Sequence, residues 1–223
     1  MSAPRQLHDL ITRWHTGWAA CRRLRRPTIT PDAIRATLKL PGRHHELFAL
    51  HADTDPAGLD RLAAATRDAD KPTWLTVFTT HPDTVTAGLT GHGLTPLTDE
   101  PETFMTIDLR RHPIVEPAPP YLAGTDTEAT PFQAVVTTAD GTVAASGTLA
   151  VTGTDAVAHN IRTDPQHRRN RLASAVMTAL VQRATDAGAT TGLLVASPAG
   201  TALYSSLGWR TLAHVVTVTA ARP

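Results

Sequence analysis

The chain has 223 residues, of which 41% are hydrophobic and 18% are charged, a composition typical of a folded protein and not of a disordered one. Lysine and arginine number 21 against 20 acidic residues, and the net charge of +1 provides no overall field that would attract nucleic acid or an anionic membrane. The single cysteine, Cys21, excludes an internal disulfide and a cysteine-based zinc site, while the lack of an 18-residue apolar run and of a secretory signal predicts a cytoplasmic protein.

The first half, residues 1–110, is predicted to form an α+β lobe. Over residues 5–24, apolar side chains recur at steps of three and four, which predicts a helix. Trp14 and Trp18 lie on its apolar face, and such a stripe is more typical of a core than of a substrate pocket. Alternation, caps and turn residues then predict strands 33–40 and 45–52 joined as a hairpin, a helix over 55–69, a strand over 74–80, a helix over 82–93 and a strand over 104–109.

Residues 111–121 hold four prolines and show no periodicity, which predicts a semi-rigid linker to a second domain, residues 122–223. In that domain Asp140-Gly141 is a typical hairpin turn. The elements predicted there are two strands flanking this turn within 132–151, a strand over 155–163, a helix from 172 to Gly188, a strand over 191–197, a short helix over 199–208 and a strand over 211–220. We therefore expect an α/β (α+β) fold, a mixed sheet covered by helices.

Three arginines and an asparagine occupy residues 168–171, directly before the predicted helix at 172. A helix N-terminus already carries partial positive charge, so the additional positive charge is expected to meet an anion. A strand, a turn rich in backbone N–H groups and a helix N-terminus together form a phosphate site, to which arginine adds bidentate hydrogen bonds. The alternative is a solvated basic turn, or one that contacts a nucleic-acid backbone.

Two sequence motifs place this half in a family. Thr163-Asp164-Pro165 is followed by RRNRLA at 168–173, and one strand later the sequence reads SPAGTALYSSLGW at 197–209. In sequence and separation, the two segments resemble the GNAT superfamily of acyl-CoA-dependent N-acyltransferases, over residues 130–220. The resemblance implies a mixed, mostly antiparallel GNAT-like sheet flanked by helices, acetyl-CoA as the cosubstrate, and no metal.

The resemblance also implies where CoA binds. The pyrophosphate is expected on the amides of the arginine-rich turn, and the acetyl oxygen and pantetheine arm on the backbones of Ile161 and Thr163. The expected cofactor-binding residues are Ile161, Thr163, Arg168, Arg169, Asn170, Arg171, Leu172, Ala173, Ser174 and Ser197. Two of them depart from the family, because Arg171 replaces a glycine and Ser197 replaces an asparagine. If residue 171 has a positive φ, arginine is strained there and CoA affinity falls, which leaves a non-catalytic relative open.

Tyr204 and His159 are the expected catalytic residues. Tyr204 matches the family's tyrosine beside the CoA sulfur, where a phenol with a pKa near ~10 can protonate the departing thiolate; the alternative is a core tyrosine. His159 is the only titratable side chain in the core of the 155–163 strand. It is expected to accept the amine proton, unless it is a buried core histidine. By strand alternation it should share a face with Val157 and Ile161.

These features predict a cytoplasmic N-acetyltransferase that moves an acetyl group from acetyl-CoA to a primary amine of a small molecule, by direct attack in a ternary complex. The alternatives are a non-catalytic CoA-binding regulator, a protein N-acetyltransferase and a nucleic-acid binder, and the near-neutral charge counts against the last. The first half is expected to be a degenerate copy of the same fold or an unrelated lobe that completes it. Because its helix start at residues 55–58 lacks the R-x-x-G-x-G/A turn, we expect CoA only in the second half, with neither nucleic acid nor membrane as a partner.

Overall fold

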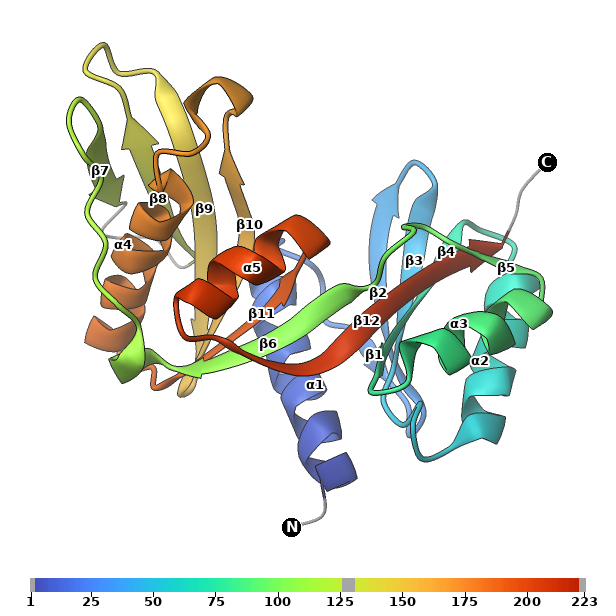
Figure 1. Ribbon diagram of the computed structural model, residues 1–223. Coiled ribbons are helices and arrows are strands. Elements are labelled where there is room, and N and C mark those ends of the chain that lie inside the picture. The colour runs from blue at the N-terminus through green and yellow to red at the C-terminus, as the bar shows by residue number, and fades with distance from the viewer. Residues whose placement is uncertain (1–2, 126–130, 221–223) are drawn as a thin grey trace.

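One twelve-stranded sheet forms the centre of the protein in the computed structural model, which describes residues 3–125 and 131–220 (Figure 1). Its strands are β1 (Thr28–Ile29), β2 (Ala33–Leu40), β3 (Arg43–Ala49), β4 (Thr73–Thr79), β5 (Leu94–Pro96), β6 (Glu102–Asp108), β7 (Leu122–Thr125), β8 (Phe132–Thr137), β9 (Val143–Thr152), β10 (Asp155–Thr163), β11 (Thr191–Ala196) and β12 (Arg210–Ala220). The helices are α1 (Ala3–Cys21), α2 (Pro56–Arg67), α3 (Pro82–Gly91), α4 (Leu172–Asp186) and α5 (Pro198–Ser206), with short 3-10 turns at Leu109–Arg111 and Pro165–His167.

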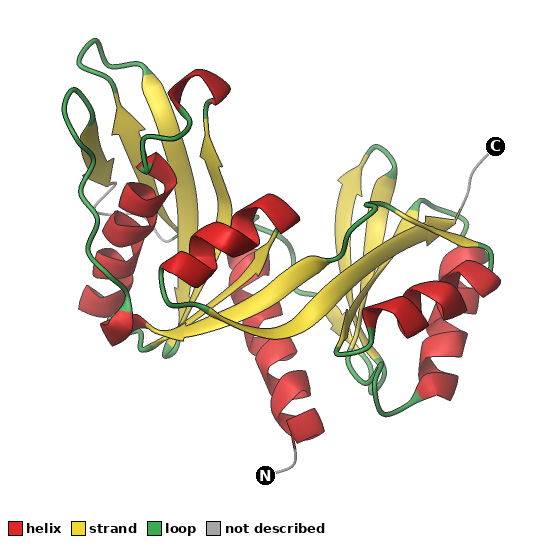
Figure 2. Ribbon diagram, in the orientation of Figure 1, coloured by secondary structure: helices red, strands yellow, loops and turns green. Residues whose placement is uncertain are grey.

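The strands follow the order β1-β2-β3-β4-β12-β6-β11-β10-β9-β8-β7, with β5 beside β12. The pairs β3–β4 and β10–β11 are parallel, and the other pairs are antiparallel. The prediction of a mixed, mostly antiparallel sheet flanked by helices is therefore confirmed (Figure 2). Each predicted helix and strand is present with ends shifted by a few residues, while β1, β5 and β7 were not predicted.

Two strands cross from one half of the chain to the other. β6 belongs by sequence to the first half, yet it pairs with β11 of the second. β12 belongs to the second half, yet it pairs with β4 of the first, and β6 and β12 also pair with each other. Figure 1 shows both strands running across the middle of the molecule. The sheet is thus continuous through both halves, and the division of the chain at residues 111–121 stays a prediction.

The two halves repeat one order of elements. Apart from the short strand β5, the first half has the order β2, β3, α2, β4, α3 and β6. The second half has the matching order β9, β10, α4, β11, α5 and β12. Each set contains an antiparallel pair, a helix that connects two parallel strands, a second helix and a strand that crosses to the other half. This correspondence is consistent with the predicted second copy of the fold.

The proline-rich segment that joins the halves lies along α4. The amide of Val115 donates a hydrogen bond of 2.9 Å to Oγ1 of Thr178, and the side chain of Val115 is buried in the core under α4. The chain then enters β7, which pairs with β8 at the edge of the sheet. The segment therefore runs against the folded core.

The helices α1 and α4 cover opposite faces of β10. Alternate residues of this strand face opposite ways, so Val157 packs under α1 while Ala156 and Ala158 pack under α4. Trp14 and Trp18 of α1 are each 5% exposed, which confirms the prediction that they belong to the core. Their neighbours in that core come from both halves of the chain and include Phe48, Phe78, Phe104, Leu193 and Val215. The core under α1 therefore joins the two halves.

Candidate active site

The parallel strands β10 and β11 separate partway along their length. Their pairing ends at Val157 and Leu193, although β10 continues to Thr163 and β11 to Ala196. Backbone N–H and C=O groups require hydrogen-bond partners, so a strand that has left its neighbour offers them to a ligand. The gap beyond Val157 is therefore the first feature of a candidate site.

A bulge interrupts β10 within this gap. Its register with β9 shifts between His159 and Arg162, and Asn160 adopts a left-handed φ of 54°. A bulge inserts one residue and re-aims the side chains that follow. As a result Ile161 packs against the core under α4, on the face opposite Val157. The prediction that His159, Val157 and Ile161 share one face is wrong, because alternation does not survive the bulge.

A cavity of about 570 Å³, here called the central cavity, opens from this gap toward the first half of the chain. Its volume lies in the range of small-molecule sites. The predicted residues His159, Ile161, Thr163, Ala173, Ser197 and Tyr204 all line it. The opposite wall comes from the first half and from the crossing strands, and it includes Arg22, Arg43, Glu46, Trp74, Thr76, Glu102 and Thr217. Both halves of the chain thus contribute to one cavity.

The arginine-rich turn lies at the N-terminus of α4. Arg168, Arg169 and Arg171 are exposed and line a second cavity of about 560 Å³, together with Ala173 and Ser174 of the first helical turn. This turn groove shares lining residues with the central cavity, namely Thr163, Ala173 and Leu203. The predicted phosphate-binding turn and the predicted catalytic residues therefore lie on either side of one narrow passage.

Arg171 has the positive φ that the sequence left as one possibility for the residue that replaces the family's glycine. Its φ is 55° and its ψ is 23°, in the left-handed region that favours glycine. Arg169 is also left-handed, with a φ of 67°. As the N-cap of α4, Arg171 makes no side-chain capping hydrogen bond. The backbone N–H groups of the first turn of α4 therefore receive no hydrogen-bond acceptor from the Arg171 side chain. In this turn, Leu172 and Ser174 are 1% and 3% exposed.

Asn170 holds the turn together from within. Its side-chain amide donates hydrogen bonds to the carbonyl oxygens of His167, at 3.2 Å, and Arg168, at 3.3 Å. It also donates to the hydroxyl of Tyr121, at 3.3 Å, and that hydroxyl contacts Nδ1 of His167 at 3.1 Å. The geometry therefore assigns the Asn170 side chain to shaping the turn.

Tyr204 of α5 lies on the wall of the central cavity and is 8% exposed. Its ring packs edge-on against Trp209, with ring centroids 6.0 Å apart. Burial raises the pKa of the phenol to about 12, so it stays protonated at neutral pH. Its hydroxyl has no hydrogen-bond partner among residues 3–125 and 131–220 and is available to a ligand.

Ser197, the second departure from the family, is the N-cap of α5. Its hydroxyl accepts a hydrogen bond of 3.2 Å from the amide of Gly200. Serine is a preferred residue for this task, since its oxygen satisfies one of the free donors of the first turn. Its exposed side chain also borders the central cavity.

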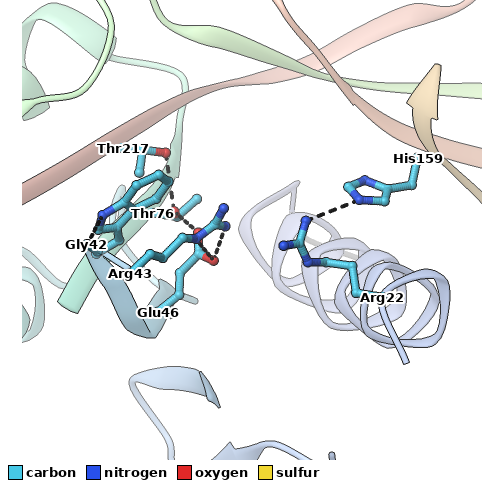
Figure 3. Close-up of polar contacts among 8 residues, drawn as sticks. Arg22, Gly42, Arg43, Glu46, Thr76, His159 and Thr217 are labelled. Carbon is cyan, nitrogen blue, oxygen red and sulfur yellow. Dashed lines mark hydrogen bonds and ion pairs between the residues drawn. The ribbon is translucent and has the colours of Figure 1, made fainter. Parts of the chain in front are cut away.

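His159 faces α1 and contacts Arg22, as Figure 3 shows. Nη1 of Arg22 lies 3.3 Å from Nε2 of His159. Because a guanidinium can only donate, Nε2 must accept this hydrogen bond and Nδ1 must carry the proton of the neutral ring. Burial, followed by the charges of Arg22 and Arg43, lowers the pKa of His159 to about 4. The imidazole is thus neutral at physiological pH and held in one tautomer.

The wall from the first half carries an ion pair between Arg43 and Glu46 (Figure 3). Glu46 is 2% exposed and also accepts a hydrogen bond of 2.6 Å from Oγ1 of Thr76. Burial raises the pKa of Glu46, and Arg43 and Thr76 lower it. The guanidinium of Arg43 lies 4.2 Å from the ring centroid of Trp74 and 5.9 Å from that of Trp18.

Sequence reasoning missed these residues of the first half. Arg22 lies near the end of the helix predicted over residues 5–24, and Glu46 lies in a predicted strand. Neither residue belongs to a motif that identifies a site. The one usable signal was Glu46 itself, a charged residue in a strand that is predicted to pack in the core. Charged side chains are rarely buried unless they are paired.

The corresponding position in the first half is closed. β3 and β4 stay paired over five residues, from His45–Thr73 to Ala49–Val77, so no gap opens between them. At the N-terminus of α2, Oδ1 of Asp55 accepts a hydrogen bond of 2.9 Å from the amide of Gly58. The cavity beside this cap measures about 10 Å³. An acidic side chain thus occupies the place where the second half presents arginines.

Among residues 3–125 and 131–220, no group of three or more His, Cys, Asp or Glu side chains is placed to hold a metal ion. Over the same residues, none of the helices has both the length and the apolar character needed to span a membrane.

Comparison with known proteins shows what this chain is similar to. A model described as the acetyltransferase (GNAT) family matches residues 101–209. No curated protein matches the chain. A GCN5-related N-acetyltransferase from Kribbella flavida has a similar structure, with a TM-score of 0.68 and 15% identity over 99% of this chain and 96% of that one. Another from Sphaerobacter thermophilus gives 0.57 and 14% over 84% and 76%. A tandem GNAT protein from the clavulanic acid biosynthesis pathway gives 0.58 and 14% over 98% and 94%. At identities this low, the structural similarity shows a shared fold and nothing more.

Proposed function

We propose that this protein transfers an acetyl group from acetyl-CoA to a primary amine of a small molecule, a proposal that the match of residues 101–209 to the acetyltransferase (GNAT) family model supports. The observation that carries the proposal is the gap between β10 and β11 beyond Val157 and Leu193. This gap connects the arginine-rich turn with a cavity of about 570 Å³, a size that suits a small acceptor better than a protein surface.

In this proposal CoA binds to the second half alone. Its pyrophosphate accepts hydrogen bonds from the first-turn amides of α4 and from the arginines of residues 168–171, as a helix N-terminus and guanidinium groups favour. The pantetheine arm then passes between β10 and β11 to the central cavity. The first half offers no equivalent, since Asp55 caps α2 with a carboxylate and a phosphate there would meet like charge.

The acetyl group would be held by the backbone of β10 beyond its last pairing with β11. We assign the amides of Ile161 and Thr163 to the acetyl oxygen and the pantetheine arm. When the amine attacks the thioester carbon, negative charge develops on the acetyl oxygen, and fixed N–H donors stabilise it by a few kcal/mol (about 3–4 per donor). The tetrahedral intermediate then collapses, the C–S bond breaks, and the hydroxyl of Tyr204 gives its proton to the thiolate.

His159 is the proposed acceptor of the amine proton. A pKa of about 4 leaves it unprotonated at neutral pH, as a base must be, but it makes the imidazole a weak base. Arg22 also occupies its Nε2, so His159 can take the proton only when Arg22 moves aside. We therefore expect the small fraction of amine that is already deprotonated to attack, so that the rate rises toward alkaline pH and His159 takes a proton only after the C–N bond has formed.

Two measurements test the proposal. Titration calorimetry should detect binding of acetyl-CoA, and release of free thiol in the presence of primary amines should then detect transfer. If acetyl-CoA does not bind, the proposed function is wrong. If it binds but no amine releases thiol, the protein is the second candidate, a non-catalytic CoA-binding regulator, which the left-handed φ of 55° at Arg171 favours.

A further inference from the structure

Two charges of the central cavity are already paired within the protein. Arg43 and Glu46 form an ion pair, and Thr76 binds the second oxygen of Glu46. The guanidinium of Arg43 also lies over the ring of Trp74, with the ring of Trp18 farther away. These contacts leave Arg43 and Glu46 with little capacity to bind an acceptor charge.

Arg22 is a cation of this cavity without an ionic partner. Its side chain is partly buried, and it forms no ion pair with any carboxylate of residues 3–125 and 131–220. Its guanidinium lies 5.2 Å from the ring centroid of Trp18 and donates to neutral His159. Within the described residues, its buried Nε–H has no hydrogen-bond partner. A desolvated guanidinium in this state binds an anion strongly.

Glu102 is an anion of the same cavity without an ionic partner. It is the first residue of β6, where it pairs with Val215 of β12, and its side chain is partly buried. It makes no hydrogen bond or ion pair with a side chain of residues 3–125 and 131–220. Burial and the charge of Glu46 raise its pKa, and the charge of Arg43 lowers it by less.

From these two charges we infer that the acceptor is an amino acid, whose carboxylate binds Arg22 and whose ammonium group binds Glu102, gives one proton to the solvent and then attacks acetyl-CoA as the neutral amine. The inference rests on the proposed function and names its substrate class. Arg22 lies in the turn that follows α1 and Glu102 lies in β6, so the two charges approach the ligand from different walls. A simple amine would leave Arg22 unpaired and a simple carboxylate would leave Glu102 unpaired, whereas a zwitterion compensates both.

The first test compares acceptors that differ in one charge. Each of the L-amino acids is assayed against its own carboxamide by thiol release at saturating acetyl-CoA. We expect at least one acid to exceed its amide about tenfold or more in kcat/KM, the scale of a hydrogen bond to a charged group. If no acid exceeds its amide, whether or not either reacts, the inference is overturned. Binding of acetyl-CoA together with turnover of alkylamines that lack a carboxylate would leave the proposed function standing in that case.

The second test assigns each charge to its residue. Arg22→Gln should raise KM for the preferred acid about tenfold or more and leave KM for its amide nearly unchanged. Glu102→Gln should raise KM for both, because both carry the ammonium group. The matched controls are Arg25→Gln and Glu100→Gln, exposed residues close by in the chain, which should change neither. An unchanged acid-to-amide ratio in Arg22→Gln would overturn the assignment of the carboxylate.

A third measurement does not depend on turnover. Calorimetry of the preferred acid with the protein–CoA complex should show binding that Arg22→Gln and Glu102→Gln each weaken about tenfold or more. Each variant must bind acetyl-CoA as the unmodified protein does, which shows that it is folded. Equal affinities for the acid in both variants and the unmodified protein would overturn the inference even if activity had changed.

Discussion

Gly17 of α1 lies directly on Val157 of β10. A Cβ atom at residue 17 would be 2.3 Å from Cγ2 of Val157 and 2.6 Å from its Cβ, distances that real atoms do not reach. The close approach sets α1 against the strand at the point where β10 parts from β11. Nearby, Nε of Arg13 donates a hydrogen bond of 2.7 Å to Asp155 and so fixes the same helix to the start of the strand. The helix that leads directly into Arg22 is thereby fixed relative to β10.

Gly17→Ala should therefore destabilise the protein. The added methyl group has to displace α1 or Val157, and overpacking of this kind costs about 1–3 kcal/mol in the free energy of unfolding. The matched control is Gly88→Ala in α3, where a Cβ meets nothing within 4 Å and alanine should stabilise the helix by up to ~1 kcal/mol. Thermal unfolding of both variants checks this. Equal melting temperatures would show that α1 is not closely packed at residue 17.

Arg168→Ala should weaken acetyl-CoA binding by about 1–3 kcal/mol if the guanidinium makes a charge-assisted contact with phosphate. Arg168 is exposed and lines the turn groove, so its removal should leave the fold intact. Calorimetry at two salt concentrations checks the cause, because a lost ionic contact also reduces the dependence of affinity on salt. Arg110→Ala, an exposed arginine that pairs with Asp108, serves as the control. An unchanged affinity would remove Arg168 from the site.

Arg171 requires a comparison of two substitutions. Arg171→Gly and Arg171→Ala both remove the guanidinium, but only glycine is relaxed at a φ of 55°. The free energy of unfolding of the glycine variant should therefore be about 1 kcal/mol higher than that of the alanine variant. If the guanidinium binds phosphate, both variants should bind CoA more weakly and with less dependence on salt than the unmodified protein. If only strain matters, glycine alone should bind more tightly.

The sequence was informative where structure is local. The strand, turn and helix at residues 155–186 were predictable because caps, turn residues and periodicity act over a few residues. The bulge at Asn160 and the left-handed Arg171 were not, since nothing in the residue types requires them. The opposite wall of the cavity was also out of reach. Arg22, Glu46 and Glu102 line one cavity with residues of the second half, whose strands join the first half through β6 and β12, and strand pairing over such separations leaves no local pattern.

Stability should fall as the pH drops below about 6.5, because His15 is buried as a neutral ring. It is 2% exposed, packs between Trp18 and Phe48, and its Nε2 lacks a hydrogen-bond partner among the described residues. Burial lowers its pKa from 6.5 to about 4. The unfolded chain therefore binds a proton at higher pH than the folded one, and the stability present above pH 6.5 is lost as the pH falls to 4.

The loss of stability due to His15 amounts to about 3 kcal/mol at most, because a shift of one pKa unit corresponds to ~1.4 kcal/mol. His15→Phe should fill the same aromatic site and flatten the change of melting temperature between pH 7 and pH 4. Part of the slope should remain, since the pKa of His159 is also about 4. The exposed His81→Gln serves as the control and should keep the full slope. A His15→Phe variant with the same slope as the unmodified protein would contradict the assignment.

Tyr204→Phe should lower kcat by about 10- to 1000-fold and leave acetyl-CoA affinity nearly unchanged. The ring packs against Trp209 with or without its hydroxyl, so folding and ground-state binding should not change. The hydroxyl is needed only when the sulfur becomes negative, and an interaction made in the transition state appears in kcat and not in binding. Tyr121→Phe is the matched control, because that hydroxyl contacts Asn170 and His167 in the turn, and its loss should affect acetyl-CoA affinity instead. Single-turnover kinetics separate slow chemistry from slow product release. If Tyr204→Phe retains the full single-turnover rate, Tyr204 is a packing residue and the acid must be another group.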